Sequence, residues 1–246
     1  MIKKLLLLFC TAVAINAIAQ DSPKNVVSLN LFSLSTGTIS LKYERAIKPW
    51  CSARIHAGYM LPHEFKALSN QLNSTADEQD QSYSTTTSNI KTELNGWHIK
   101  PEFVFYTGSE AVRGYYIGLY GKIDRYSITF PVTVDHEKWK ETGGINRIGG
   151  GMIMGYQWLI ADKVSIDWYF LGLGIDSYTF DFKAKSNSST VTNISQADLD
   201  DAEQQLSDAG LSGFKAEKTS SNSFKITSPS KLFPCFRTGL SIGYAF

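Results

Sequence analysis

The last stretch of the chain, Leu232–Phe246, constrains the fold more strongly than any other part of the sequence. Counted back from the C-terminus, every second residue is large and mostly apolar, and the residues between them are small or polar. A period of two describes a strand whose two faces meet different surroundings. Strands of soluble sandwiches usually have about 5–6 residues, so this longer strand with its terminal aromatic predicts the closing strand of a transmembrane β-barrel. The larger set is Leu232, Pro234, Phe236, Thr238, Leu240, Ile242, Tyr244 and Phe246.

The N-terminus has the pattern of a secretory signal peptide. Lys3 and Lys4 precede an apolar run over Leu5–Ala14, and Ala17 and Ala19 form a small-residue cleavage site. The apolar run is too short to cross a bilayer as a helix. We therefore expect residues 1–19 to be removed by cleavage near Ala19, and residues 20–246 to form a single barrel domain.

Charge and hydropathy exclude several classes of protein. Without Lys3 and Lys4, 22 basic side chains remain against 23 acidic ones, a formal charge of −1. This balance provides no basic patch for nucleic acid. No second stretch is apolar enough for a membrane helix, which leaves a soluble exported protein or a barrel in the outer membrane of a Gram-negative bacterium.

Two cysteines, Cys51 and Cys235, remain after the expected cleavage. An even number of cysteines in an oxidising compartment favours a disulfide. In the barrel, however, Cys51 begins one strand and Cys235 lies near the opposite end of the last one. The two cysteines would then lie about a membrane thickness apart, far more than the about 7 Å that a disulfide allows between Cα atoms. We therefore expect both thiols to be free.

Eight stretches of the chain have the character of strands, and Thr38–Ile47 alternates most regularly. Short turns alternate with longer polar loops over 62–96, 131–145 and 183–230. Outer-membrane barrels show this asymmetry, with short periplasmic turns and longer extracellular loops. The sequence therefore predicts an all-β fold, an eight-stranded antiparallel up-and-down transmembrane β-barrel with long extracellular loops. The expected strands are 25–34, 38–47, 51–61, 97–106, 113–130, 146–160, 164–182 and 232–246.

Three positions depart from regular alternation. Apolar residues change phase within 164–182, which predicts a bulge near Gly172 or Gly174. Pro101 and Pro234 fall inside expected strands, and each removes a ladder hydrogen bond. Because a closed barrel has no edge, we expect local bulges or fraying at both prolines.

The last long loop contains one segment with helical spacing of apolar residues. Leu199, Ala202 and Leu206 recur at this spacing within Gln196–Ala209. Ser195 is suited to cap its start, and the segment is followed by a glycine. We expect a helix here that folds over the mouth of its own barrel, with docking of a partner as the alternative.

The inward-facing positions of the expected strands carry charges of both signs. An eight-stranded barrel is just wide enough for side chains to fill it, and buried charges must be paired. We therefore expect an ion-pair network that fills the lumen, with a narrow ion path as the alternative. Its members are Lys42, Glu44, Arg54, Lys100, Glu102, Lys122, Asp124, Asp167 and Arg237.

Signals for catalysis or metal binding are weak. His63 and His136 lie in the expected loops, where they are candidates for an enzyme that acts at the extracellular rim. Neither belongs to a recognisable nucleophile–base arrangement. Histidines and cysteines are scattered without the spacing of metal ligands. We therefore expect a protein that is not an enzyme and has no metal and no cofactor.

Several segments resemble the small outer-membrane β-barrel families of Gram-negative bacteria, in particular a family of uncharacterised function. Its eight-stranded architecture is like that of OmpA or OmpX. The segments are Ile39–Arg45 (ISLKYER), Lys100–Tyr106 (KPEFVFY), Gly114–Tyr126 (GYYIGLYGKIDRY), Gly149–Trp158 and Gly239–Phe246. The resemblance implies insertion by the barrel-assembly machinery, which reads the terminal aromatic strand. In this chain the signal would comprise Leu240, Ile242, Tyr244 and Phe246. The resemblance implies no activity.

These expectations combine into one functional hypothesis and three alternatives. The hypothesis is an outer-membrane barrel with a filled lumen, in contact with lipid, whose loops 62–96 and 183–230 meet an extracellular or envelope partner. The alternatives are a small pore, an enzyme at the outer rim, and a soluble exported barrel that binds a ligand in its cavity. The last one requires apolar side chains to point inward.

Overall fold

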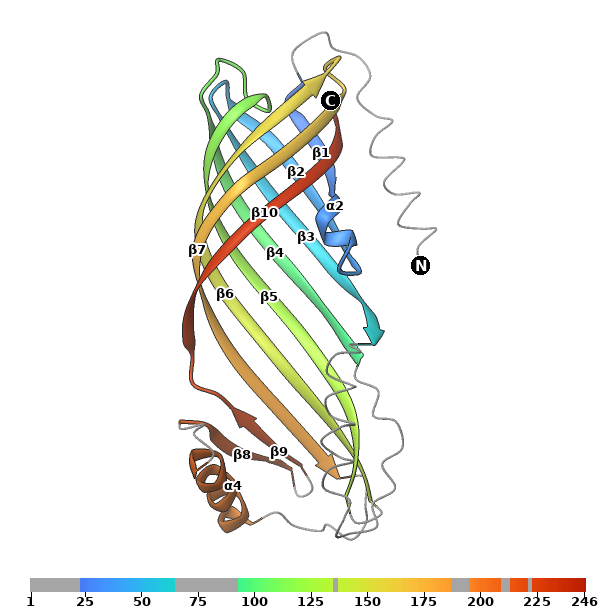
Figure 1. Cartoon of the computed structure of the whole chain (residues 1–246), viewed down its shortest axis with the longest axis vertical. Helices are drawn as coiled ribbons and strands as arrows, with labels where there is room; N and C mark the ends of the chain where they lie inside the picture. The colour runs from blue at the N-terminus through green and yellow to red at the C-terminus, as the bar shows by residue number, and fades with distance from the viewer. Residues whose placement is uncertain (1–22, 65–92, 135–136, 187–194, 209–212, 221–222) are drawn as a thin grey trace.

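The computed structural model describes residues 23–64, 93–134, 137–186, 195–208, 213–220 and 223–246. Eight antiparallel strands follow one another around a ring, which closes because the last strand pairs with both the seventh and the first (Figure 1). The predicted all-β, eight-stranded antiparallel order is confirmed. The strands are β1 (Asn25–Asn30), β2 (Thr38–Lys48), β3 (Cys51–Glu64), β4 (Glu93–Tyr106), β5 (Gly114–Val134), β6 (Glu137–Ile160), β7 (Val164–Ser186) and β10 (Lys231–Ala245).

The two ends of the ring differ. At one end, here called the turn end, short turns join β2 to β3, β4 to β5 and β6 to β7, and the start of β1 meets the residue that follows β10. Asn25 and Phe246 exchange backbone hydrogen bonds there, each with an N···O distance of 2.9 Å. At the other end, the loop end, β5, β6 and β7 extend well beyond the other strands (Figure 1).

The loop end also carries a small hairpin and a helix. The hairpin consists of β8 (Lys215–Ser220) and β9 (Ser223–Thr227), and β9 continues the sheet from β7. The predicted helix over 196–209 is confirmed as α4 (Gln196–Asp208). Buried Leu199 of α4 packs on Ala216 of β8, so the helix lies on the hairpin rather than over the ring.

The expected loop over 131–145 is wrong, because its described residues extend β5 and β6 in register from Val134 opposite Glu137. The hairpin β8–β9 likewise lies within the segment expected to be loop. Both ladders lie towards the loop end. In β9, Phe224 and Ile226 alternate with polar residues and pack near Leu199 and Ala216, a periodic signal over five residues that sequence reasoning missed.

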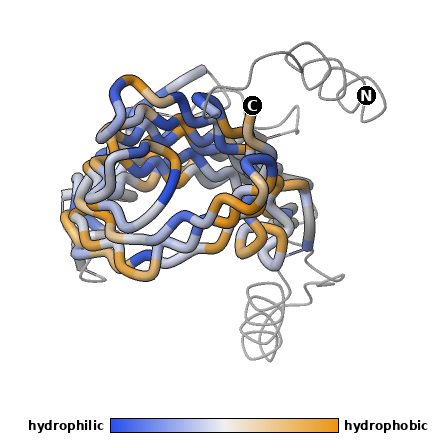
Figure 2. The backbone as a smooth tube through the Cα atoms, turned by 90° about the horizontal axis from the view of Figure 1, so that it is seen from above, coloured by the Kyte–Doolittle hydropathy of each residue, from blue (hydrophilic) through white to orange (hydrophobic). Residues whose placement is uncertain are grey.

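The faces of the ring are opposite in polarity to those of a soluble protein. In β2, Lys42 and Glu44 point inward and are buried, whereas Ile39 and Leu41 point outward and are exposed. Phe103 and Ile117, which would pack in the centre of a soluble barrel, are 55% and 42% exposed. Figure 2 shows hydrophobic and hydrophilic residues alternating along the strands.

The strand β7 contains the bulge that its sequence predicts, slightly earlier than expected. Its register against β6 shifts between Leu171 and Tyr169, which leaves Phe170 as the extra residue. The register against β10 shifts at the same level. The bulge explains why the exposed apolar residues Val164 and Trp168 lie at even positions before Phe170, whereas Leu173 and Ile175 lie at odd positions directly after it.

The two prolines behave differently. The ladder between β4 and β5 is interrupted at Lys100 and Pro101 without a change of register. Pro234 pairs with Ile175 in regular register, so the local disruption expected there is wrong. The expectation assumed that β10 has no edge, and this assumption fails at Pro234.

The edge exists because β1 is short. The expected first strand, 25–34, ends at Asn30, whose side chain accepts a hydrogen bond from the Ser33 amide at 3.0 Å and caps the one-turn helix α2 (Leu31–Leu34). β1 pairs with β10 only opposite Ser241–Ala245. The remainder of β10, Lys231–Leu240, pairs with β7 on one side and with no described strand on the other. We call this stretch the open edge.

Candidate functional site

The interior nearest the turn end contains a group of ion pairs around Arg54. Its guanidinium lies 3.0 Å from Glu44 and 3.5 Å from Asp167 Oδ2, and Lys42 Nζ lies 2.5 Å from the same Asp167 oxygen. All four side chains are at most 3% exposed. Charges buried in a low dielectric require such pairing. We call these four residues the inner ion-pair cluster.

Neutral side chains add hydrogen bonds to the inner ion-pair cluster. Arg54 Nη2 donates to the Tyr106 hydroxyl at 2.7 Å and to Gln157 at 2.6 Å. Ser52 donates to Glu44, and Tyr116 donates to Asp167 at 2.7 Å. Sequence reasoning missed these residues, although their inward phase in each strand was readable. Together they fill the ring across its width near the turn end.

Further ion pairs lie towards the loop end. Glu102 lies 3.1 Å from His56, while Lys122 pairs with Asp176 and Arg147 pairs with Asp124. Asp176 and Arg147 were not among the expected interior residues. Arg147 occupies an inward position of β6 that the alternation indicates, whereas the inward position of Asp176 depends on the bulge at Phe170.

Arg237 and Lys100 complete the nine expected interior residues and are the least enclosed of them. The Arg237 guanidinium lies over the Tyr120 ring at 4.2 Å and over the Tyr169 ring at 5.5 Å. Its nearest carboxylate oxygen, on Glu102, is 3.9 Å away, so this ion pair is weak. Its Nη1 atom is buried and has no hydrogen-bond partner among the described residues. Lys100 forms no ion pair with a described residue. These two cations therefore carry charge that the described residues compensate weakly or not at all.

A cavity of about 640 Å³ lies beside these two residues, and we call it the wall cavity. It extends from Thr36, in the turn after α2, to the open edge of β10. Four basic side chains line it, and none of its described lining residues is acidic. The basic residues are Lys100, Lys122, Arg147 and Arg237.

Inward glycines create the room for the aromatic rings of the interior. A Cβ atom at Gly155 would lie 2.4 Å from the Tyr116 hydroxyl, and one at Gly239 would lie 2.4 Å from the Tyr169 ring. A Cβ atom at Gly174 would lie 2.2 Å from the Tyr120 hydroxyl. At these three positions, a larger residue would collide with a tyrosine ring or hydroxyl.

The structure also contains a serine–histidine pair that sequence reasoning missed. Ser40 Oγ lies 3.0 Å from His98 Nε2, and both residues are buried. Neither lines the wall cavity. Two histidines were candidates for an enzyme. His63 belongs to β3, but its side chain is not described, and His136 lies outside the described residues.

No group of three or more His, Cys, Asp and Glu side chains suited to a metal ion occurs in the part of the chain that the structure describes. Cys51 and Cys235 are both free, as the separation of their strand ends predicts. Cys235 Sγ lies 3.3 Å from the Tyr120 hydroxyl and 3.4 Å from Asp176 at the wall cavity.

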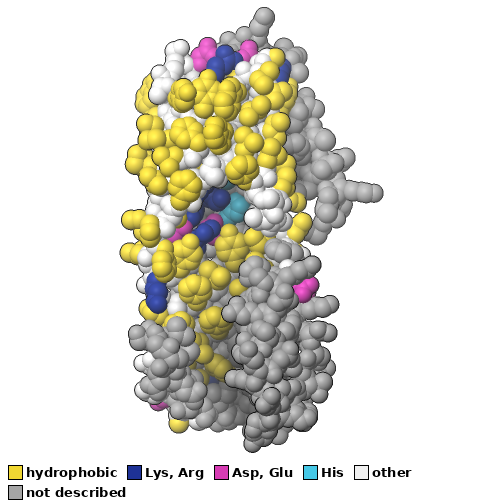
Figure 3. Space-filling view, viewed as in Figure 1, with side chains coloured by type: hydrophobic (Ala, Val, Ile, Leu, Met, Phe, Trp, Pro, Cys, Tyr) yellow, Lys and Arg dark blue, Asp and Glu magenta, His cyan; other side chains and the backbone are white. Residues whose placement is uncertain are grey.

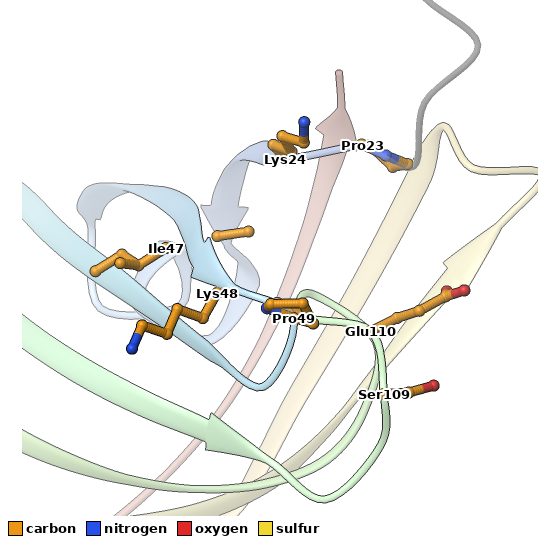
Figure 4. A pocket seen from close by; sticks show the side chains of 9 residues that line it. Pro23, Lys24, Ile47, Lys48, Pro49, Ser109 and Glu110 are labelled. Carbon is orange, nitrogen blue, oxygen red and sulfur yellow. The ribbon is translucent and has the colours of Figure 1, made fainter.

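A second cavity, of about 280 Å³, lies at the turn end between the start of β1 and the turns at Pro49 and Glu110. Figure 4 shows that the charged ends of Lys24, Lys48 and Glu110 point in different directions. No set of polar groups converges on this cavity, so it is the weaker candidate for a ligand site.

The four residues expected to form the assembly signal lie at the turn end of β10. Ile242 is exposed on the outer face, and the Tyr244 ring stacks on Phe246 with centroids 6.4 Å apart. Lys163 lies over the Tyr244 ring at 5.7 Å. Leu240 lies at the end of the open edge, where pairing with β1 begins. Their role in assembly remains a prediction.

Among the described residues, no helix is both long and apolar enough to cross a membrane. The structural class is an all-β ring of eight antiparallel strands, with ionic side chains inside and apolar side chains outside. Within this class, the chain belongs to the family described as protein of unknown function (DUF3575), whose model matches residues 4–196. No curated protein matches the chain.

Two solved structures are similar in overall shape. A major outer membrane protein from Thermus thermophilus is 13% identical, with a TM-score of 0.40 over 90% of this chain and 98% of that chain. CarO2 of Acinetobacter baumannii is 10% identical, with a TM-score of 0.31 over 91% of this chain and 98% of that chain.

Proposed function

We propose that the protein is a transmembrane barrel of a bacterial outer membrane, with a structural or surface-interaction role and no catalytic activity. The observation that carries this proposal is the inverted polarity of the ring. Large apolar side chains, such as Phe103 and Leu119, are 55% exposed on the outer face, whereas Lys42 and Asp167 are 1% exposed inside.

The physical argument concerns what covers the outer face. Monomeric soluble proteins rarely expose contiguous apolar patches larger than a few hundred Å². In this protein, every strand of the ring except β1 carries exposed large apolar side chains, and so does α2, which follows β1. Only a surrounding hydrocarbon layer covers such a belt on every side. Where each strand is paired on both sides, the ring also satisfies its backbone hydrogen bonds without water, and the open edge of β10 is the exception.

The inner ion-pair cluster supports a structural role over a pore. The Arg54 side chain bridges from β3 to Glu44 on β2 and Asp167 on β7, across the lumen. Tyr106, Tyr116 and Gln157 occupy the remaining space. Side chains that fill an eight-stranded ring leave no continuous water path. Planar-bilayer recordings of the purified protein are therefore expected to show no large, reproducible conductance steps.

In this proposal the turn end faces the periplasm and the loop end faces outward. The short turns and the long extensions of β5–β7 support this orientation. The segments 62–96 and 183–230 would then provide the contact with an extracellular or envelope partner, and the second of them contains α4 and the hairpin β8–β9. The barrel-assembly machinery would insert the chain by reading Leu240, Ile242, Tyr244 and Phe246.

The orientation is tested by cysteine labelling on intact cells. The variants carry Glu217→Cys in β8 or Ser109→Cys in the β4–β5 turn, both exposed, in a chain with Cys51 and Cys235 replaced by serine. A membrane-impermeant maleimide is expected to label Glu217→Cys at least 10-fold faster than Ser109→Cys. Release of the protein by carbonate washing, or faster labelling of Ser109→Cys, would contradict the proposal.

A further inference from the structure

The open edge leaves the apolar wall of the ring interrupted on one side. From Lys231 to Leu240, β10 has no described strand on this side, and α2 contacts both β10 and β2. Figure 3 shows a hollow in the apolar surface at mid-height, with basic, acidic and histidine side chains visible at its base. The wall cavity, which joins Thr36 to the open edge, is therefore accessible from the side of the ring.

The charges inside the wall cavity favour an anion. Lys122 and Arg147 are paired with Asp176 and Asp124, which lie behind the lining. Lys100 has no ion pair with a described residue. Arg237 reaches Glu102 only at 3.9 Å and keeps a buried Nη1 atom without a partner among the described residues. Glu102 also lies 4.0 Å from Arg54, so this one carboxylate is shared between two guanidinium groups and cannot neutralise both, and at least one positive charge is left available.

The rim of the wall cavity has the opposite character. Phe236, which lines it, is 66% exposed on the open edge, and Phe233 of the same strand, which packs on the Tyr178 ring, is 49% exposed. Leu34 of α2, two residues before the lining residue Thr36, is 43% exposed. A ligand that enters between these residues passes apolar side chains first and meets guanidinium and ammonium groups only at the inner end. This order matches an amphiphile with an acidic head group.

We propose that the wall cavity binds the acidic head group of a lipid-like amphiphile, which enters sideways from the membrane through the gap at the open edge. Lys100 and Arg237 hold the phosphate or carboxylate, and the acyl chain stays along Phe236 outside the wall. The proposal rests on the membrane location proposed above. A volume of about 640 Å³ lies within the range of about 300–1,000 Å³ of small-molecule sites and exceeds what one inorganic phosphate needs.

The binding test uses the purified full chain in neutral dodecyl maltoside micelles, with native mass spectrometry as the readout. The probes are lysophosphatidylglycerol, which is anionic, and lysophosphatidylcholine, which has the same chain but a zwitterionic head group. The unsubstituted protein is expected to retain the anionic probe at concentrations at least 10-fold lower. Equal retention of both probes would overturn the proposal.

Matched variants assign the binding to the wall cavity. Lys100→Gln with Arg237→Gln is expected to abolish the preference for the anionic probe. Arg45→Gln with Lys48→Gln removes the same charge from exposed outer positions and is expected to preserve it. Loss of the preference in the Arg45/Lys48 variant, or its retention in the Lys100/Arg237 variant, would contradict binding in the wall cavity. Competition by inorganic phosphate at the same concentration as the lipid would indicate a free anion instead and overturn the amphiphile.

Cys235 gives a second readout in which the basic residues are unchanged. Its thiol lines the wall cavity, whereas Cys51 is buried at the turn end. In a Cys51→Ser variant, lysophosphatidylglycerol is expected to slow maleimide labelling of Cys235 at least 5-fold, and lysophosphatidylcholine is not. Unchanged labelling would overturn the proposal. Both tests use purified protein in micelles, so their failure would overturn the amphiphile site without affecting the cell-labelling test. The proposed membrane location and the proposed ligand site are therefore tested separately.

Discussion

The two halves of the interior contain the same kinds of residues but use them differently. In the half near the turn end, Arg54, Glu44, Lys42 and Asp167 form a buried group in which every charge has a close partner of opposite sign. In the half that contains the wall cavity, Arg237 lies mainly against aromatic rings, and Lys100 has no ion pair with a described residue. Alternating polarity alone therefore does not determine how an interior is used.

The difference follows from the length of β1. Where β1 continues the ring, β10 is paired on both sides and the interior is sealed. Where α2 replaces the strand, one edge of β10 is open and the interior reaches the side of the molecule. A sealed interior must compensate its charges internally, whereas an interior with an opening has room for a charged ligand.

The largest effect is expected from breaking the sealed half at Arg54. Arg54→Met leaves Glu44 and Asp167 with fewer partners in a buried site. Removing one partner of a buried ion pair costs about 3–5 kcal/mol. The free energy of unfolding, from urea titration in micelles, is expected to fall by about this amount. Arg45→Met, at an exposed position, is the control, and an equal loss there would contradict the comparison.

A smaller effect is expected from overpacking at Gly155. A Cβ atom at this position would lie 2.4 Å from the Tyr116 hydroxyl and 2.8 Å from the Trp168 carbonyl oxygen. Overpacking typically costs about 1–3 kcal/mol, so Gly155→Ala is expected to lower the midpoint of urea unfolding. Gly121→Ala, whose nearest neighbour would be 3.8 Å away, is the control. If both variants unfold at the same midpoint, the glycine is not needed for space.

The serine–histidine pair is expected to contribute modestly to stability and nothing to catalysis. Ser40→Ala removes one buried hydrogen bond to His98, which is worth about 0.5–1.5 kcal/mol. Urea titration measures this loss. Turnover of a fluorogenic ester or phospholipid by the unsubstituted protein that disappears in Ser40→Ala would favour an enzyme over the proposed function.

The smallest effect is expected at Lys100. Because it has no ion pair with a described residue, Lys100→Gln is expected to change the free energy of unfolding by less than about 0.5 kcal/mol. Lys42→Gln removes the same charge from the sealed half, where Lys42 lies 2.5 Å from Asp167, and is expected to cost several times more. Equal losses in urea titration would remove the distinction between the two halves.

Much of the ring could be predicted from the sequence, because the alternation of apolar and polar residues in β2, β4 and β10 depends on local geometry alone. The inward phase of Lys42, Arg54 and Glu102 follows from this alternation. Asp176 could not be placed, because the bulge at Phe170 reverses the phase of the residues after it. A bulge shows in the sequence as a phase change, but its position does not.

The wall cavity could not be predicted for a different reason. The end of β1 depends on Asn30, whose side chain caps α2, and one capping hydrogen bond leaves little trace in a sequence of apolar residues. The residues after it, Leu31 to Leu34, are as apolar as those of a strand that faces lipid. The pattern thus indicates the environment of the segment and not its backbone conformation.

The backbone hydrogen bonds between Asn25 and Phe246 join residues that lie 221 positions apart in the sequence. Because β1 pairs with β10, the ring is complete only when the first and the last of its eight strands meet. No shorter segment that lacks either strand can form the closed circumference. Closure is therefore the most non-local contact of the ring, and contacts of this kind are slow to form because the long intervening chain must be ordered first.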